Sequence, residues 1–400
     1  MKTPAKTPRL RAFCSAIATT LAVATCVVAP SSASPNTPLR THLGNGPRVS
    51  AMTSGDGYYL YTISGATFGV NTPIHVLTFD SSQYSVKIGL AHNAIDGGDQ
   101  TVSSMCQSTP NCVAAVNGDF FDVSDPHEPV VGDEVGGIIR NCVLLHTPET
   151  AHEQVDLDGP SVSEGLDWSS AVDANGISVP ITAINQELPM KYLGVNAPLA
   201  GTLLFTAQYA LPTPVAARRV TYEFVESGST ASPTTINTTS ELQLVGQTSK
   251  PVRVAPDHVD ISAVAGSALA DLSVGKTISL TTTSTAGCDT IGGHPILLNN
   301  GVVGPINRKD TYMASPYART IIGWTATGDT VILSIGGVDD KSGATMYQMV
   351  TLLLSLDVVT AIDLDGGDST TLFADGRVLY PTLKTERPVS TSLLIVSKPQ

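Results

Sequence analysis

The sequence predicts an α+β fold: a β-rich single domain of mixed sheets with a few helices and a central β-rich insertion. Of its 400 residues, 42% are hydrophobic, and 35 glycines and 26 prolines are distributed among them. Frequent valine, isoleucine and threonine with this many turn formers are typical of short strands joined by tight turns. A chain of this length can bury one large core or two smaller ones.

The N-terminal 33 residues have the pattern of a secretory signal. Basic residues within 2–11 precede an apolar stretch over 13–29, and small residues follow at 31–33, the order found in cleavable signal peptides. Two alternatives stay open: lipidation at Cys26, whose neighbours fit a lipoprotein signal poorly, and an uncleaved anchor, although the stretch is shorter than the roughly 20 residues of a spanning helix. We expect residues 1–33 to be removed and the mature protein to be secreted, extracellular and without a membrane span.

A polar, flexible lead-in is expected over residues 34–57, followed by one domain over residues 58–398. Alternation of apolar and polar residues predicts strands, and apolar residues at helical spacing predict the longest helix over 344–356. The segment 145–285 contains strands with polar interruptions and is the predicted insertion. The predicted strands cover 58–63, 74–79, 84–90, 113–116, 203–209, 220–225 and 278–283, and two short helices cover 100–107 and 267–272.

The charge balance narrows the possible partners. The formal net charge is −13, and no run of lysine and arginine occurs beyond the first residues. Such a protein is a poor general binder of nucleic acid or of an anionic membrane. An anionic substrate would need a local group of arginines. The sequence does not indicate an oligomeric state.

Four cysteines remain after the predicted cleavage, and in an exported protein they indicate two disulfides with three possible pairings. The short loop between Cys106 and Cys112 favours a local bridge, which would leave Cys142 to pair with Cys288. Their spacing resembles no zinc site.

The segment 361–373 is the most informative part of the chain. Within nine positions it contains three acidic residues, two glycines and three hydroxyl side chains: Asp363, Asp365, Gly366, Gly367, Asp368, Ser369, Thr370 and Thr371. Adjacent glycines allow a sharp turn and a close approach to a ligand, and crowded carboxylates demand compensating partners. The alternative is a turn that joins two strands.

Three other segments share this layout of a strand followed by a polar corner that contains glycine. They cover 117–122, 292–295 and 319–323, and an Asn-Asn-Gly turn follows at 299–301. Strand ends that place polar residues at one rim commonly form a binding site.

In this order, the four segments resemble the motifs of the phosphodiester glycosidase family, over about residues 58–396. The resemblance rests on Asn-Gly-Asp-Phe-Phe at 117–121, Gly-Gly-His-Pro at 292–295, Arg-Thr-Ile-Ile-Gly at 319–323 and Asp-Leu-Asp-Gly-Gly-Asp-Ser at 363–369. Three residues depart from the family pattern by adding acid: Asp119 and Asp368 replace glycine, and Asp363 replaces asparagine. These changes leave a bound divalent cation or a less anionic substrate open, and no cofactor is required.

The resemblance implies a hydrolase that cleaves the anomeric bond of glycosyl phosphodiesters or related cell-surface and extracellular polysaccharide linkages. Arg319 is the candidate phosphate clamp, because a guanidinium can pair with two phosphate oxygens; its alternative is an ion pair with a carboxylate. Asp365 is the candidate catalytic carboxylate, acting on the sugar or on an attacking water, and its alternative is a turn cap. Asp363 is expected to tune Asp365 or to bind a cation.

The remaining candidates are expected to contact a carbohydrate or sugar-phosphate substrate. Asn117 either binds ligand hydroxyls or the 363–371 loop, Gly118 allows close approach, and Phe120 or Phe121 provides an apolar face. His294 is expected to be structural, and a serine hydrolase is excluded because the chain lacks a Gly-x-Ser-x-Gly elbow. The other predicted substrate-binding residues are Asp119, Gly292, Gly293, Thr320, Gly366, Gly367, Asp368, Ser369 and Thr370.

A second hypothesis is a glycan-binding envelope protein that keeps the site without turnover. The acids at positions 119, 363 and 368 motivate it, since they would oppose a bound phosphate.

Overall fold

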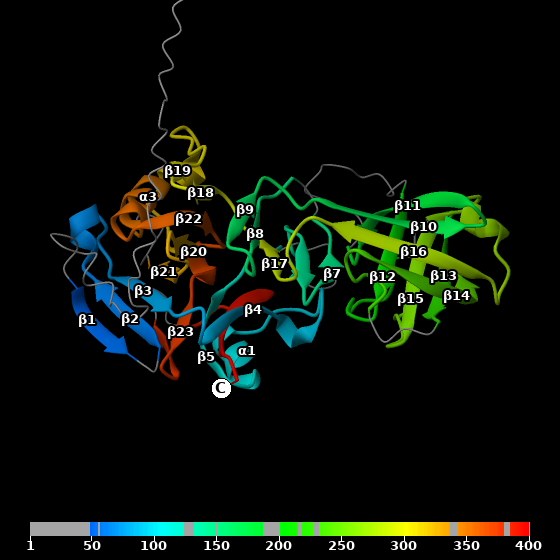
Figure 1. Cartoon of the computed structure of the whole chain (residues 1–400), viewed down its shortest axis with the longest axis horizontal. Helices are drawn as coiled ribbons and strands as arrows, with labels where there is room; N and C mark the ends of the chain where they lie inside the picture. Colours follow the sequence, from blue (N-terminus) through cyan, green and yellow to red (C-terminus); the bar gives the residue numbers. More distant parts are fainter. Residues whose placement is uncertain are drawn as a thin grey trace, which may run out of the picture. The chain divides into compact units, whose positions relative to one another are not determined.

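The computed structural model describes residues 49–54, 57–123, 132–148, 151–186, 201–214, 218–227, 232–336, 342–379 and 385–399. The predicted signal over 1–33 and most of the predicted lead-in lie outside the described residues. The described chain is rich in strands and contains few helices, arranged in several sheets and a barrel (Figure 1). The predicted fold class, a β-rich α+β domain, is confirmed.

Two sheets share the largest apolar core. Buried residues of both, such as Leu77 and Ile332 from the first and Ile88 and Leu393 from the second, belong to one cluster. The eight-stranded sheet has the order β1 (Val49–Ser54), β2 (Tyr58–Ile63), β3 (Ile74–Phe79), β21 (Thr330–Ile335), β20 (Arg319–Thr325), β22 (Val358–Asp363), β18 (Ile296–Asn299) and β19 (Val302–Val303). The five-stranded sheet has the order β24 (Arg377–Leu379), β23 (Leu372–Ala374), β5 (Cys112–Asn117), β25 (Thr391–Ser397) and β4 (Tyr84–Leu90).

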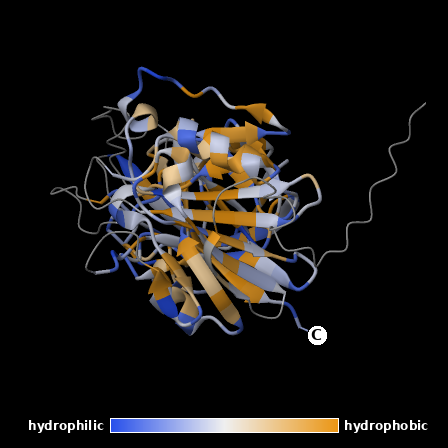
Figure 2. Cartoon of the chain, turned by 90° about the vertical axis from the view of Figure 1, so that its left-hand side faces the viewer, coloured by the Kyte–Doolittle hydropathy of each residue, from blue (hydrophilic) through white to orange (hydrophobic). Residues whose placement is uncertain are grey.

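Helices cover the outer faces of these two sheets. Successive residues of a strand point to opposite faces, so Ile322 joins the core between the sheets while Ile321 packs with helix α3 (Met346–Ser355) on the outside. Helix α1 (Val102–Ser108) packs through Val102 and Met105 against the second sheet. Hydrophobic residues follow the strands and hydrophilic residues gather at their ends and in the loops (Figure 2).

A third sheet and a barrel form the middle of the chain. Within the predicted β-rich insertion over 145–285, the strands between 168 and 284 form a closed barrel, and an apolar cluster joins barrel residues with Ile139 and Leu144. The sheet has the order β7 (Val143–His146), β6 (Ile138–Arg140), β17 (Thr290–Gly292), β8 (Gln154–Asp156) and β9 (Ser161–Ser163). The barrel has the order β10 (Trp168–Ala174), β11 (Ile177–Ile184), β12 (Thr202–Thr206), β15 (His258–Val264), β13 (Arg219–Glu226), β14 (Thr238–Thr248) and β16 (Thr277–Ser284).

Both expected disulfides are present. Cys106 is bonded to Cys112 across the end of α1, and Cys142, in the turn after β6, is bonded to Cys288, which precedes β17. The second bridge therefore joins the segments that lead into and out of the barrel.

The short elements differ modestly from expectation. Strand β1 lies inside the segment predicted to be a flexible lead-in, where it pairs antiparallel with β2. The remaining helical turns are η2 (Gly65–Phe68), η3 (Ala91–Asn93), η5 (Ala268–Asp271), α2 (Thr311–Ala314) and η6 (Gly367–Ser369). Among the described residues, no helix has both the length and the apolar character needed to cross a bilayer.

Candidate functional site

Antiparallel pairing brings the polar corners together. Strands β20 and β22 pair with Ile321 opposite Asp363, so the start of one strand meets the end of the other. In the second sheet, Asn117 at the end of β5 lies opposite Ser392 at the start of β25. The motifs at 117–121, 319–323 and 363–371 therefore meet, although about 200 residues of sequence separate the first from the second.

Asn117 ties these corners to one another. Its side chain has no exposed surface, and its Oδ1 accepts hydrogen bonds from Thr320 Oγ1 (2.7 Å) and Thr371 N (3.2 Å). Its Nδ2 donates to the carbonyl oxygen of Asp365 (2.7 Å). Of the two contacts expected for Asn117, the structure shows the one with the 363–371 loop.

The loop after β22 presents Asp365. This side chain is half-buried, and its Oδ1 accepts from the backbone N–H of Gly366 (2.8 Å). Burial raises the pKa of Asp365 to about 6, against hydrogen bonds from Ser369 and Gly366 and the charge of Arg387. The backbone of Gly367 adopts a φ of +57°, with open space where a side chain would lie. Asp368 is exposed, whereas Ser369 and Thr370 are buried.

Arg319 is a buried anchor in this structure. It has no exposed surface; Nε donates to the carbonyl of Ala344 (3.1 Å) and one Nη to that of Tyr312 (2.5 Å). The other Nη lies 3.4 Å from Asp363 Oδ2. The guanidinium also stacks on the rings of Tyr312 and Tyr317. The structure thus shows the ion-pair alternative for Arg319, with Asp363 as the partner, and leaves its donors turned away from solvent.

Asp363 is held by two groups. Besides Arg319, the hydroxyl of Tyr312 donates to its Oδ2 (2.7 Å), while its Oδ1 has no hydrogen-bond partner among the described residues. Burial raises the pKa of Asp363 to about 7, in spite of the opposing effect of Arg319. Burial also raises the pKa of Tyr312.

A second buried carboxylate pairs with a histidine. Asp119 Oδ1 lies 2.9 Å from His152 Nε2, and Gly292 and Gly136 pack against Oδ2 so closely that neither position has room for a side chain. Burial lowers the pKa of His152, but the charge of Asp119 and the hydrogen bond to it outweigh burial, so the net pKa is raised. Glu134 is buried nearby, and burial together with the charge of Asp119 raises its pKa.

Aromatic rings line the accessible side of the site. The half-buried Phe120 makes edge contacts with His152 and Tyr312, with ring centroids 5.9 Å apart in each pair. His294 lies nearly parallel to Tyr312, and its Nδ1 is 2.8 Å from Glu153 Oε2. Phe121 is buried in the cluster beneath α1 instead. Of the two phenylalanines, Phe120 therefore has the accessible ring.

Arg387 is the cation beside Asp365. It is half-buried, its Nη donates weakly to Ser369 Oγ (3.4 Å), and its guanidinium lies over the Phe121 ring. Its charge lowers the pKa of Asp365. Arg319 is the arginine inside a strand-end motif, but it is fully buried, whereas Arg387 is partly exposed.

The sequence prediction missed several members of the site. His152, Glu134 and Tyr312 come from segments without a recognisable motif, and only the preceding Asp310, a helix N-cap, marks the turn that contains Tyr312. Gly293 contributes a backbone N–H to the carbonyl of Glu153 (3.0 Å). Within the described residues, no three histidine, cysteine or acidic side chains are grouped to hold a metal ion.

Comparison with known proteins points in the same direction. Residues 231–396 match the phosphodiester glycosidase family. A segment of 66 residues is 39% identical to N-acetylglucosamine-1-phosphodiester alpha-N-acetylglucosaminidase from Bos taurus and equally to that from Homo sapiens. It spans 16% of this chain and 12% and 13% of those proteins.

Two solved structures share the fold. A hypothetical protein from Synechocystis superposes with a TM-score of 0.66 and 17% identity, over 88% of this chain and 64% of that one. A protein from Burkholderia pseudomallei that is named as a putative exported protein superposes with a TM-score of 0.61 and 17% identity, over 81% of this chain and 74% of that one. At this identity they show the fold alone. The similarity to the phosphodiester glycosidase family is therefore shown for residues 231–396, which include the motifs at 292–295, 319–323 and 363–369.

Proposed function

We propose that this protein is an exported hydrolase that cleaves the bond between the anomeric carbon of a sugar and a phosphodiester. The family match supports the reaction class. The single observation that carries the proposal for these residues is the neighbouring pair of half-buried side chains, Asp365 and Arg387, which offers a carboxylate and a cation on the accessible side of the site.

In this proposal Asp365 activates water. With a pKa of about 6, it is mostly ionised at neutral pH and still basic enough to accept a proton. Water oxygen bonds to the anomeric carbon, Asp365 takes the proton, and the bond from that carbon to the phosphate oxygen breaks. The electron pair leaves with the phosphate monoester, which is stable as an anion and needs little protonation.

Arg387 is the proposed phosphate contact. A guanidinium on the accessible side can pair with two phosphate oxygens and stabilise the charge that grows on the leaving group. His152, which is hydrogen-bonded to Asp119 and contacts Phe120, is a further polar neighbour. The accessible ring of Phe120 offers an apolar surface for the sugar.

Arg319, Asp363 and Asn117 are positioning residues in this scheme. The buried ion pair fixes the end of β22 against the start of β20, and Asn117 holds the following loop. A buried charge pair of this kind is costly to break, because the remaining partner is left uncompensated. Their loss would displace Asp365.

The proposed location is extracellular. The signal-like pattern over residues 1–33 supports export, and both disulfides suit an oxidising compartment. Glycosyl phosphodiesters of cell surfaces and extracellular polysaccharides are the corresponding substrate class.

The extra acids do not favour the alternative of a binding protein without turnover. Asp363 is paired with Arg319, Asp119 with His152, and Asp368 is exposed. Two of the three are therefore paired with basic side chains and would oppose a phosphate less than their number suggests.

The proposal is tested by incubating the mature protein with α-glycosyl phosphodiesters that differ in sugar, beside ordinary α-glycosides, with and without chelator. We expect release of free sugar from at least one phosphodiester and none from the glycosides. Saturable binding without release from any phosphodiester would instead support the binding protein.

A further inference from the structure

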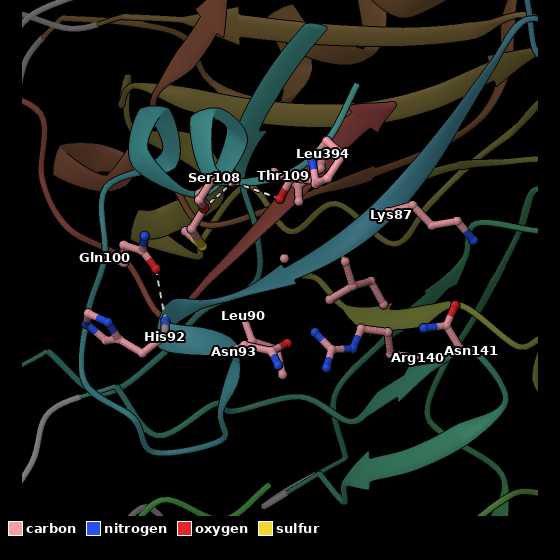
Figure 3. A pocket seen from close by; sticks show the side chains of 14 residues that line it. Lys87, Leu90, His92, Asn93, Gln100, Ser108, Thr109, Arg140, Asn141 and Leu394 are labelled. Carbon is pink, nitrogen blue, oxygen red and sulfur yellow. Dashed lines mark hydrogen bonds between the residues drawn. The ribbon is translucent and has the colours of Figure 1, made fainter. Parts of the chain in front are cut away.

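A pocket of about 610 Å³ lies away from the candidate site. It is lined by strand β4 and the following turn, by the end of α1 and by the turn after β6 (Figure 3). None of its lining residues belongs to the site described above. The pocket could therefore bind a ligand independently of the site that contains Asp365.

Arg140 supplies an uncompensated cation to this pocket. It lies at the end of β6, is half-buried, and forms no hydrogen bond or ion pair with the described residues. Burial lowers its pKa, an effect that Asp289 partly offsets. Asp289 is already occupied, because Lys87 Nζ (2.5 Å) and the backbone N–H of Asn141 (2.9 Å) both bind its carboxylate. The guanidinium points toward Asn93 (Figure 3).

The charge of the lining is opposite to that of the protein. The chain has 35 acidic and 22 basic residues, yet the lining contains Lys87 and Arg140 and no carboxylate. A half-buried guanidinium without a partner is unfavourable for stability. A bound oxyanion would supply the missing partner.

The turn after β4 is shaped to present polar groups. His92 and Asn93 both adopt left-handed backbone conformations, with φ of 52° and 57°, which are uncommon for residues other than glycine. Gln100 Oε1 accepts the N–H of His92 (2.9 Å), and Gln100 Nε2 donates to Ser104 (2.9 Å), so this turn is fixed. The amide of Asn93 is left without a hydrogen bond to the described residues.

Apolar side chains complete the lining. Leu90, Met105 and Leu394 border the pocket, so it combines a cation and free amides with an apolar wall. This mixture suits a sugar, which has hydroxyl groups and apolar C–H faces, better than a bare ion.

We propose that this pocket is a second binding site, specific for an anionic sugar whose phosphate or carboxylate pairs with Arg140 and whose hydroxyls bind Asn93 and Asn141. The proposal does not depend on hydrolysis at the candidate site. Phosphate and carboxylate share the chemistry that a guanidinium recognises, and the experiment separates them.

Isothermal titration calorimetry of the mature protein with glucose 6-phosphate, glucuronate and glucose tests the site. We expect binding of one or both anionic sugars, at least tenfold weaker in Arg140→Gln and partly retained in Arg140→Lys, with glucose much weaker. Stronger binding of glucose 6-phosphate identifies phosphate as the recognised group, and stronger binding of glucuronate identifies carboxylate. Arg377→Gln, which removes an exposed arginine of β24, is expected to bind like the parent.

Hydrogen–deuterium exchange locates the ligand and separates this site from that of Asp365. Protection by the anionic sugar is expected at residues 87–93 and 140–142, and it should persist in Arg387→Gln. Thermal melting of Arg140→Gln is expected to match or exceed that of the parent, because an uncompensated charge is removed. Equal affinity of Arg140→Gln and the parent, absence of binding, or protection confined to the loop at 363–371 would overturn the proposal.

Discussion

The site contains two neighbouring arginine–aspartate pairs. The two pairs differ in exposure, and their roles differ for that reason. Arg319 and Asp363 are both fully buried, and the guanidinium of Arg319 is paired with backbone carbonyls and with Asp363. Arg387 and Asp365 are half-buried, and within the described part of the chain Arg387 has one weak hydrogen bond, to Ser369. The buried pair fixes the strand ends, whereas the accessible pair is available to a substrate.

Substitution of Arg387 tests both its proposed contact with the phosphate and the effect of its charge on the pKa of Asp365. Arg387→Gln is expected to raise KM for a glycosyl phosphodiester by roughly 10- to 100-fold, the effect of losing a charge-assisted hydrogen bond. Because the charge of Arg387 lowers the pKa of Asp365, its removal should move the acidic limb of the kcat profile to higher pH. The measurement is KM and kcat between pH 4.5 and 8.

Arg387→Lys is the control for this prediction. This variant keeps the positive charge but loses the planar guanidinium that can pair with two phosphate oxygens. KM should therefore rise while the acidic limb of the kcat–pH profile stays in place. If Arg387→Gln leaves both KM and the limb unchanged, Arg387 does not contact the phosphate.

At the scale of elements, the site depends on how closely β5 and β25 approach each other. The N–H of Gly118 donates to the carbonyl of Thr391 (2.9 Å), and its own carbonyl accepts from the N–H of Asp365 (3.1 Å). A side chain at Gly118 would meet Thr391 Oγ1, with the Cβ of Thr391 at 2.9 Å and its carbonyl carbon at 3.0 Å. Close packing, rather than an unusual backbone angle, therefore requires glycine here.

Gly118→Ala is expected to destabilise the protein and to lower its activity together. Overpacking of this kind costs about 1–3 kcal/mol, and the shift of the backbone would displace Asp365. Gly159→Ala is the matched control, because a Cβ there comes no closer than 3.4 Å to its neighbours. Urea unfolding and sugar release measure the two effects, and a Gly118→Ala variant that is fully active and as stable as the parent would contradict the close packing.

The sequence predicts elements better than it predicts their contacts. The strands 58–63, 74–79 and 84–90 have the predicted bounds, because alternation is a local signal. The predicted helix over 344–356 shortens to Met346–Ser355, where Thr345 caps its start. Both disulfides were also predicted, since a short loop limits the pairings.

The contacts among residues of the site depend on pairing and packing between strands that are distant in sequence, which the sequence patterns do not predict. Motifs indicated which corners hold polar residues. The β20–β22 register places Asp363 opposite Ile321, so Arg319 reaches Asp363 diagonally, through its side chain. His152 and Tyr312 reach the site from segments whose sequence carries no signal of function. Burial, which separates Arg319 from Arg387, emerges only once the sheets are packed.

At the scale of the whole molecule, several carboxyl groups are buried in an already acidic protein. In the barrel, Asp260 is 1% exposed, faces Glu223 across the β13–β15 pair, and keeps one oxygen without a hydrogen bond to the described residues. Burial, with the charge of Glu223, raises its pKa to about 7. Burial also raises the pKa values of Asp363 and Glu134.

These groups should make the protein less stable as the pH rises. Between the unfolded pKa of about 3.9 and the folded pKa of about 7, the folded state holds a proton on Asp260 that the unfolded state has lost. Stability therefore falls across this window. Relative to the parent, Asp260→Asn should gain on the order of 2–4 kcal/mol more at pH 8 than at pH 4, because each pKa unit corresponds to about 1.4 kcal/mol.

Urea unfolding of the parent and Asp260→Asn at pH 4, 6 and 8 measures this difference. Asp271→Asn, which changes an exposed carboxylate, is the control and should differ from the parent by a constant amount. A difference for Asp260→Asn that does not change with pH would show that Asp260 titrates normally.

The central claim is that Asp365 carries out hydrolysis of a glycosyl phosphodiester. The most direct measurement is kcat for sugar release by the parent, Asp365→Asn and Asp271→Asn, on the best substrate of the phosphodiester panel, with urea unfolding to confirm that each variant is folded. We predict that Asp365→Asn loses at least 100-fold in kcat, consistent with loss of a general base, and that Asp271→Asn retains the activity of the parent. A folded Asp365→Asn variant that releases sugar at the parental rate would contradict the account.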